Sequence, residues 1–195
     1  ASAANFAFTN RQMISHWVRE TFEQVLQMGP RDLNLDLVYD VCHNIAKIEE
    51  HKVGNQTKKV CVHRKGATRA FPAGHPQTPK KYQEIGQPVL VPGDMGRYSY
   101  VLVGLPGAME QTFGSTCHGA GRMMSRTKAK QSSKGRSIER ELEDRGIFVK
   151  SKGRNTLHEE VSEAYKDVSL VVDICENAGI SKKVAKLCPV GVIKG

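Results

Sequence analysis

The apolar residues of this chain occur in short runs that glycine and proline repeatedly interrupt. Runs of β-branched and aromatic residues between turn residues are typical of short strands. Such runs lie at residues 33–41, 60–62, 88–91, 98–103, 147–149 and 190–193. Apolar residues at three- and four-residue steps, each stretch stopped by a glycine, predict helices at residues 5–28, 138–142 and 168–178. Because these elements do not alternate as regular β–α–β units, the expected fold class is α+β.

The first expected helix carries a broad apolar stripe. Its members are Phe6, Met13, Ile14, Trp17, Val18, Phe22, Val25 and Leu26. Such a stripe normally packs on a protein core, which is the role expected of Trp17. Nothing precedes the helix to pack against so large an apolar face, so the chain is expected to be part of a longer protein.

Positive charge is concentrated in two segments of the chain. Residues 122–154 hold eleven Lys or Arg against four acids, and residues 47–82 hold nine against two. Each segment therefore has a net charge of +7, while the whole chain has a net charge of +9. Two basic surfaces could flank one site, and they favour an anionic partner. Nucleic acid is the first expectation and an acidic membrane surface the second.

The cysteines and the hydropathy indicate where the protein works. The five cysteines are scattered, odd in number and without a CxxC pair, which argues against a disulfide framework or a zinc knuckle. A reducing, cytoplasmic location fits this pattern. No apolar run approaches the roughly 20 residues that span a bilayer, so no membrane segment is expected. With 195 residues and 39% hydrophobic residues, a single globular domain is expected.

The segment GSTCHGAGRMMSR, residues 114–126, is the strongest candidate for chemistry. Glycines and small residues around His118 would let backbone N–H groups approach a phosphate. If a helix begins near Ala120, Arg122 and Arg126 would share one of its faces. His118 is then a candidate nucleophile or phosphate ligand. The residues alone leave open a tight turn with an incidental histidine, and by themselves favour it.

Other segments offer weaker candidates. His43 and Asn44 follow an expected strand and could reach a metal or a phosphate, although a lone histidine there is more often only hydrogen-bonded. Three cations surround a glycine in residues 62–71 and could hold phosphates of a polyanion, with a solvated turn as the equal alternative. They are Arg64, Lys65 and Arg69. The segment 92–100 ends in hydroxyl groups that could contact a base or a ribose, and by itself is an ordinary turn.

Seven ordered segments together resemble a known family. In chain order they read DLVYDVCHNIAK, CVHRKGATRAFP, GQPVLVPGDMG, SYVLVG, FGSTCHGAGRMMSR, EAYKDV and PVGVIKG. In order and spacing they resemble the RtcB family of GTP-dependent RNA ligases over the whole chain. The resemblance implies mixed, layered sheets flanked by helices, present here in incomplete form. It also implies the joining of an RNA 3′-phosphate or 2′,3′-cyclic phosphate to a 5′-hydroxyl, as in tRNA splicing and RNA repair, with GTP and Mn²⁺.

The resemblance further assigns roles to residues. It makes His118 the histidine that attacks GTP and carries GMP as a phosphoramidate, and His43 a manganese ligand. The GTP-binding positions it implies are Asn44, Pro92, Gly93, Asp94, Met95, Ser99, Gly119, Ala120, Gly121, Tyr165 and Lys194. The RNA-binding residues it implies are Arg122, Arg126 and Lys65. The expected partners are RNA, such as tRNA halves, and GTP.

The resemblance also implies that a part is missing. Family members are longer, and an Asp, a Cys and two His metal ligands, with the acid that contacts guanine, would lie upstream of Ala1. Residues 1–195 are thus expected to be the carboxy-terminal, nucleotide-binding part of such a ligase, inactive alone and monomeric when completed by the upstream part. The alternatives are a non-catalytic module that binds RNA or phosphate, and a complementation fragment that needs the upstream part for solubility.

Overall fold

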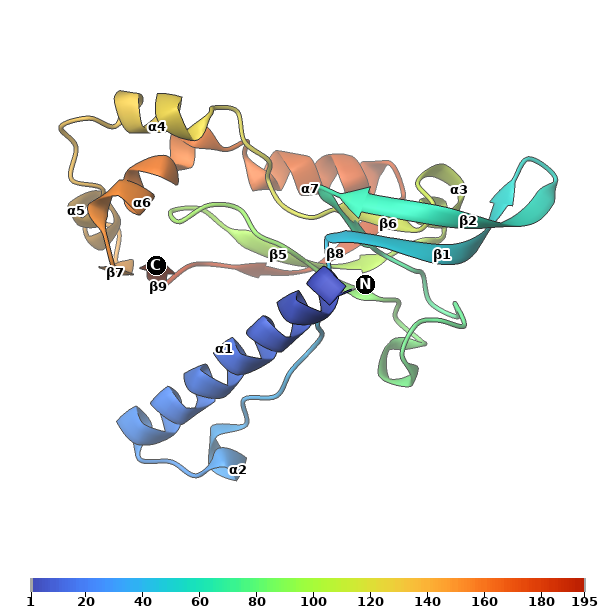
Figure 1. Ribbon diagram of the computed structural model, residues 1–195, viewed down its shortest axis with the longest axis horizontal. Helices are drawn as coiled ribbons and strands as arrows, with labels where there is room; N and C mark the ends of the chain where they lie inside the picture. Colours follow the sequence, from blue (N-terminus) through green and yellow to red (C-terminus); the bar gives the residue numbers. More distant parts are fainter. Residues whose placement is uncertain (1, 195) are drawn as a thin grey trace.

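The computed structural model describes residues 2–194 and has the α+β class that the sequence predicts (Figure 1). The main helices are α1 Ser2–Leu26, α2 Pro30–Leu33, α3 Pro106–Gln111, α4 Arg126–Ser132, α5 Ile138–Glu143, α6 Arg154–Glu159 and α7 Val168–Asn177. Short 3₁₀ turns occupy Lys80–Tyr82 and Ser162–Ala164. The strands are β1 Asn44–Val53, β2 Gln56–Lys65, β3 Ala67–Arg69, β4 Pro88–Val91, β5 Ser99–Gly104, β6 Ser115–Cys117, β7 Phe148–Ser151, β8 Ser181–Leu187 and β9 Gly191–Lys194.

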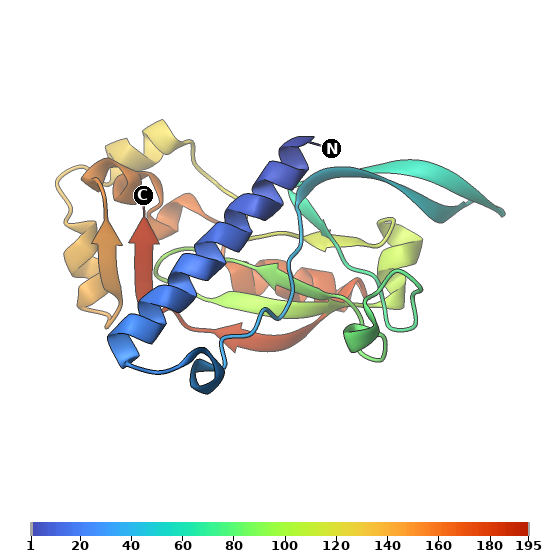
Figure 2. The same cartoon turned by 60° about the horizontal axis from the view of Figure 1, so that its bottom comes forward.

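Helix α1 confirms the helix expected at residues 5–28, but its apolar stripe is not packed in a core. None of its described residues is buried, and 56% of Trp17 is exposed, which corrects the core role expected of this side chain. In Figure 1, α1 and α2 extend away from the sheets; in Figure 2, where the bottom of that view comes forward, α1 crosses in front of them. The stripe is therefore an open apolar surface in this chain. No helix within residues 2–194 combines the length and the hydropathy needed to cross a bilayer.

The strand expected at residues 33–41 is wrong. Pro30–Leu33 is a helical turn, and Asn34 has a left-handed backbone with φ 48°. The following backbone joins no sheet, and side chains take some of its carbonyl groups instead. Arg19 Nε donates to Leu35 O at 2.8 Å, and the Tyr82 hydroxyl donates to Val38 O. Alternating apolar residues form a strand only where a second strand lies alongside.

Strands β1 and β2 form a long antiparallel hairpin, which Figure 1 shows projecting from the molecule. Gly54, with φ 61°, lies in the two-residue turn between them. Strand β1 was not expected, because the charged residues of its sequence NIAKIEEHKV obscure the alternation. His43 and Asn44 therefore do not follow a strand, which corrects the expectation: His43 directly precedes β1, and Asn44 is its first residue.

Helix α7 packs on the three-stranded sheet of β4, β5 and β8. In this sheet β5 is the central strand and pairs antiparallel with both β4 and β8. Strands β4 and β5 match the expected runs 88–91 and 98–103. The buried residues of this core are Ala70, Val89, Val91, Tyr100, Leu102, Ala120, Val168 and Val172. The core thus joins the sheet to Ala120, two residues beyond His118.

A second core lies under helices α4, α5 and α6, beside the parallel pair of β7 and β9. Its buried residues are Met95, Ala129, Ile138, Leu142, Ile147, Leu157, Val161 and Ala164. The expected helix at 138–142 and the strands at 147–149 and 190–193 are confirmed here, as is the helix 168–178 in the first core. Gly146 and Gly179 stop their helices with φ of 77° and 68°.

Candidate functional site

His118 follows directly after β6, a short strand that pairs with β3. The register places Cys117 opposite Ala67, and the Cys117 side chain packs on the core of the central sheet. Because side chains alternate along a strand, the inward direction of Cys117 leaves His118 on the outer side. Gly66 lies next to the imidazole: a Cβ there would be 3.8 Å from His118 Cδ2. Lys65, the last residue of β2, adjoins this glycine.

The two histidines predicted to act in chemistry lie together. The rings of His43 and His118 are stacked, with centroids 4.7 Å apart and 4° between their planes. Burial, and then the neighbouring His43, hold the pKa of His118 below its ordinary value. The imidazole of His118 is therefore neutral at pH 7, with one ring nitrogen free of a proton.

A cavity of about 310 Å³ opens between β4, β5 and β9. The predicted nucleotide-binding residues that line it are Pro92, Gly93, Asp94, Met95, Ser99, Tyr165 and Lys194. Segments far apart in the sequence thus bring most of that set to one pocket. Of the remaining four, Gly119 and Ala120 contact the wall at Pro92, while Gly121 and Asn44 do not line it.

The loop after His118 is fixed to this pocket. Ala120 N donates to Pro92 O at 3.0 Å, and Lys166 N donates to Gly121 O at 3.0 Å. No helix begins near Ala120, which corrects the expectation: Gly121 has φ 75°, and α4 begins only at Arg126, behind the cap Ser125. A left-handed residue interrupts a right-handed helix. Arg122 and Arg126 therefore do not share a helix face.

Asp94 builds the pocket floor. Its Oδ1 accepts hydrogen bonds from the backbone N–H groups of Gly96 and Arg97 at 3.0 and 3.1 Å, and from the Ser162 hydroxyl. Its Oδ2 lies 2.7 Å from Arg97 Nε, and the side chain is fully buried. Such an Asp fixes a turn through its own side chain. The carboxylate thus shapes the pocket through the 92–97 turn.

A substitution at Gly93 should close this pocket. A Cβ at Gly93 would lie 2.1 Å from Tyr98 O, so Gly93→Ala forces the turn to move. We expect a loss of about 1–3 kcal/mol in the free energy of unfolding, and a loss of nucleotide binding measured by calorimetry. Gly153→Ala is the control, because a Cβ there meets nothing within 4 Å. Nucleotide binding by Gly93→Ala equal to that of the control would contradict the placement of the pocket.

Glu160 is a pocket residue that the sequence analysis missed. It accepts hydrogen bonds from Arg122 Nη1 at 3.2 Å and from the Tyr165 hydroxyl, and Lys194 Nζ lies 3.9 Å from its Oε2. Burial, followed by Glu160, raises the pKa of Tyr165 above its ordinary value. Glu160 thus gathers two predicted nucleotide residues and one predicted RNA residue. Its only signal in the sequence is an ordinary acidic pair, residues 159–160.

The two predicted RNA-binding arginines differ in their surroundings. All three side-chain nitrogens of Arg122 donate within the protein, to Met124 O, Glu160, the Tyr165 hydroxyl and Glu159 O. Arg126 is 70% exposed and lies 3.4 Å from a Glu159 carboxylate oxygen. Arg126 therefore presents its charge to solvent, whereas Arg122 holds the pocket wall together.

The cations of residues 62–71 also differ in their burial and partners. Arg64 donates to both carboxylate oxygens of Glu49 at 2.9 and 2.8 Å, and the exposed fractions of the two side chains are 1% and 2%. His51 Nε2 lies 3.0 Å from the same carboxylate, which gives a structural role to a histidine assigned none from the sequence. Arg64 is thus not available to hold a phosphate, while Lys65 is exposed.

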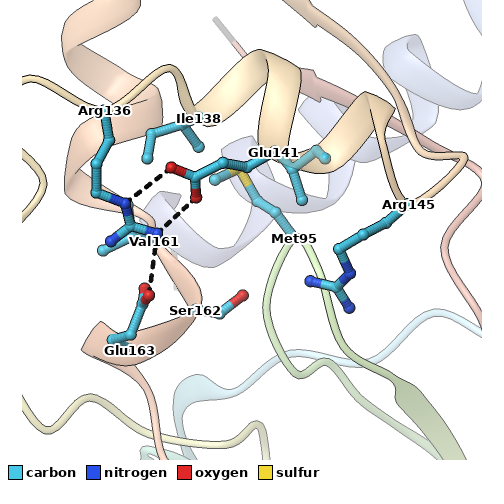
Figure 3. Close-up of a pocket in the computed structure, with 9 residues that line it drawn as sticks. Met95, Arg136, Ile138, Glu141, Arg145, Val161, Ser162 and Glu163 are labelled. Carbon is cyan, nitrogen blue, oxygen red and sulfur yellow. Dashed lines mark hydrogen bonds and ion pairs between the residues drawn. The ribbon is translucent and has the colours of Figure 1, made fainter.

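A smaller cavity of about 150 Å³ lies on the other side of Met95, which lines both cavities. Figure 3 shows three of its charged residues paired: Arg136 Nη2 lies 2.6 Å from Glu141 and 3.0 Å from Glu163. The fourth, Arg145, donates to Gly96 O, in the turn that Asp94 holds. The charged side chains of this cavity are thus bound within the protein.

The described residues do not form a complete metal site. Within residues 2–194, no three His, Cys, Asp or Glu side chains are grouped as metal ligands. The imidazole that stacks on His43 is that of His118, which offers a second nitrogen. This chain therefore supplies at most part of the set of ligands that a bound transition metal needs.

Comparison with known proteins identifies the family. The family model of tRNA-splicing ligase RtcB matches residues 1–195. The chain is 56% identical over 195 residues to the tRNA-splicing ligase RtcB of Archaeoglobus fulgidus, covering 100% of this chain and 40% of that protein. It is 56% identical over 194 residues to that of Pyrococcus abyssi, covering 100% of this chain and 21% of that protein. The chain thus spans about a fifth to two fifths of these relatives, and it belongs to the RtcB family.

Proposed function

We propose that this chain is the nucleotide-binding part of an RNA ligase, acting together with the remainder of a longer protein. The ligase would join RNA 3′-phosphate or 2′,3′-cyclic phosphate ends to 5′-hydroxyl ends, as in tRNA splicing and RNA repair. The observation that carries the proposal is the pocket of about 310 Å³, whose wall at Pro92 is hydrogen-bonded to the loop of a neutral, accessible histidine. The names of the relatives, tRNA-splicing ligase RtcB, support the same reaction.

The proposed nucleophile is His118. A ring nitrogen free of its proton would attack the α-phosphorus of GTP, the N–P bond would form, and the bond to the β-phosphate oxygen would break and release pyrophosphate. The GMP group would then pass from His118 to an oxygen of the RNA 3′-phosphate. Attack by the 5′-hydroxyl on that activated phosphorus would form the new RNA linkage and release GMP. The lowered pKa of His118 supports the first step, because only neutral imidazole is a nucleophile.

The pocket offers three kinds of contact for the nucleotide. Tyr165 presents an aromatic ring, suited to a base, and Glu160 together with Arg122 holds its hydroxyl group in place. Lys194 supplies a cation for a phosphate, and Ser99 supplies a hydroxyl group that can donate to an oxygen. We propose that these side chains orient GTP so that its α-phosphorus faces His118.

We propose His43 as one ligand of Mn²⁺, since imidazole suits such a metal. The other ligands would come from the remainder of the ligase, because the described residues group no three of them.

RNA binding is proposed for the exposed cations around the site, chiefly Arg126 and Lys65. Arg122 would contribute through the pocket wall, because its nitrogens already donate within the protein. In the complete ligase, Arg126→Ala should weaken RNA binding and lower the slope of log K against log salt by about 0.7, the value for one phosphate contact on a single strand. Titrations at several salt concentrations measure this slope. The control Arg140→Ala changes an exposed residue of α5 and should leave the slope unchanged. Equal slopes for the two variants would show that the RNA site lies elsewhere.

A joining assay tests the function. The complete ligase, given GTP, Mn²⁺ and RNA with 3′-phosphate and 5′-hydroxyl ends, should produce a joined RNA in which the phosphate of the 3′ end is retained in the linkage. Labelled 3′-phosphate that leaves as inorganic phosphate would contradict the proposed reaction.

A second candidate is a non-catalytic fragment that binds RNA or phosphate, or that complements the remainder of the ligase. The exposed apolar stripe of α1 and the incomplete metal site favour it for this chain alone. It predicts that the isolated chain self-associates, and that mixing with the remainder of the ligase lowers its apparent mass in sedimentation.

A further inference from the structure

A small, charged cavity of about 50 Å³ lies outside the nucleotide pocket and shares none of its lining residues. It is enclosed by Phe8 of α1, by the segment 39–42, and by side chains from β1, β2 and β3. Its polar lining includes Lys47, Arg64, Arg69 and Gln87. One water molecule needs about 10–15 Å³ of such space, so the cavity is larger than a single water requires.

The side-chain amide of Gln87 gives the cavity an unsatisfied donor. Gln87 Oε1 accepts from Arg69 Nε at 3.2 Å and from Phe71 N at 3.4 Å. Both partners are donors, so they fix which end of the amide carries the oxygen. Gln87 is fully buried, and its Nε2 has no acceptor in the described part of the chain. A buried donor without a partner costs about 1–3 kcal/mol, unless a bound species accepts from it.

The charges beside Gln87 are not balanced by carboxylates. Glu49 binds Arg64 through both oxygens, and its Oε1 is 4.0 Å from the nearest Arg69 nitrogen. Asp40, which also lines the cavity, pairs with Arg11 at 2.6 Å. Lys47 forms no ion pair among the described residues. Lys47 and Arg69 are therefore left with a surplus of positive charge.

The surroundings of Lys47 disfavour its charged form. Burial is the largest cause that lowers the pKa of Lys47 below its ordinary value, and repulsion from Arg69 comes second. The attraction of Glu49 opposes both, and it exceeds the further repulsion from Arg64. A bound anion would compensate the repulsion and stabilise the charged form of the amine. Cations with a fixed amide donor are a recognised arrangement for an oxyanion.

We infer that this cavity is a second anion site, which binds a tetrahedral oxyanion of the phosphate class between Lys47, Arg69 and the Nε2 of Gln87. The anion could be free inorganic phosphate or the phosphate of a small monoester, and both would make the same contacts. The inference does not depend on ligase activity, because the cavity is separate from the nucleotide pocket.

Titration of the chain with sodium phosphate tests the site, with sodium chloride at equal ionic strength as the blank. Lys47→Met should weaken phosphate binding about tenfold or more, as expected for the loss of one charge-assisted contact. Lys52→Met is the matched control, because it removes a lysine of the same strand away from the cavity, and it should bind phosphate like the unchanged chain. Lys194→Met removes the cation of the nucleotide pocket and thereby reports any phosphate that binds there instead.

Gln87→Glu tests the contribution of the Nε2 donor alone. It keeps the oxygen that accepts from Arg69 and Phe71 but replaces the Nε2 donor with a second carboxylate oxygen. We expect phosphate binding to be abolished, while the melting temperature without phosphate is maintained or raised by the new pairing with the surplus cations. Parallel titration with glycerol 3-phosphate distinguishes the sources: tighter binding than phosphate indicates a monoester, and weaker binding indicates the free ion. Phosphate binding that is retained in Lys47→Met and Gln87→Glu, or lost only in Lys194→Met, would overturn the inference.

Discussion

In the proposed complete ligase, His118→Ala is expected to abolish the proposed covalent guanylate while leaving RNA binding nearly intact. Alanine has no ring nitrogen to form the N–P bond, and the proposed RNA contacts lie on other side chains, such as Arg126 and Lys65. The adduct is measured with radiolabelled GTP after denaturation in alkaline conditions, where a phosphoramidate is retained. RNA binding is measured in the same preparation by a filter assay.

The matched control is His63→Ala, which removes an exposed histidine of β2. It should retain the full amount of adduct, because this side chain does not contact the nucleotide pocket. Guanylylation of His118→Ala at the level of His63→Ala would refute the assignment of the nucleophile. A loss of RNA binding as large as the loss of adduct would instead indicate that His118→Ala disturbs the fold.

Arg64→Met is expected to reduce the free energy of unfolding of the chain by about 3–5 kcal/mol, because it leaves the Glu49 carboxylate buried and without its bidentate partner. Arg64 also donates to Ser115 Oγ at 2.8 Å and Phe113 O at 2.9 Å, so it joins the β1–β2 hairpin to the segment leading to His118. Urea unfolding followed by circular dichroism measures the change. Lys58→Met, an exposed lysine of the same strand, is the control and should change it by less than about 0.5 kcal/mol.

The pH dependence of this effect follows from Glu49. Burial raises its pKa, but hydrogen bonds from Arg64 and His51 outweigh burial and lower the pKa below its ordinary value of 4.5. A lowered carboxylate pKa stabilises the fold at pH values above the unfolded pKa, and this stabilisation is lost as the pH falls through the folded value. The difference in the free energy of unfolding between Arg64→Met and the unchanged chain should therefore have its largest value at pH 7 and decrease in acid. A constant difference, or one below about 1 kcal/mol at pH 7, would show that the pair does not stabilise the hairpin.

The elements that could be predicted from the sequence are those whose pattern is local. The helix at residues 168–178 and the strands at 88–91 and 98–103 combine apolar periodicity with glycine or proline at their ends, and the structure confirms them. Strand β1 could not be predicted, because its buried side chains are the polar Glu49 and His51. Glu49 pairs with Arg64 of the facing strand, and His51 pairs with Glu49. The strand expected at 33–41 failed for the opposite reason, since no second strand lies alongside its apolar residues.

In the candidate site, too, local patterns could be predicted from the sequence, whereas contacts between distant segments could not. His118 and the turn around Gly93 could be singled out from the sequence because glycines beside functional side chains are a local signal. The proximity of the turn around Gly93 to Tyr165 and Lys194 could be expected only through the resemblance to a family, since three separate segments meet at the pocket. Glu160 could not be found in either way. Its role arises from contacts with Arg122 and Tyr165 that only the folded chain brings together.

The stacking of His43 on His118 also depends on the fold, because the start of β1 and the end of β6 must lie at one place. Because of this proximity the two predicted histidines form one site. The central claim is that His118 of this site carries GMP. The most direct measurement is the intact mass of this chain after incubation with GTP and Mn²⁺, alone and with a separately prepared remainder of the ligase. We expect the mass of one GMP, localised to His118, only in the mixture. An adduct on another residue, or no adduct in a mixture that joins RNA, would contradict the account.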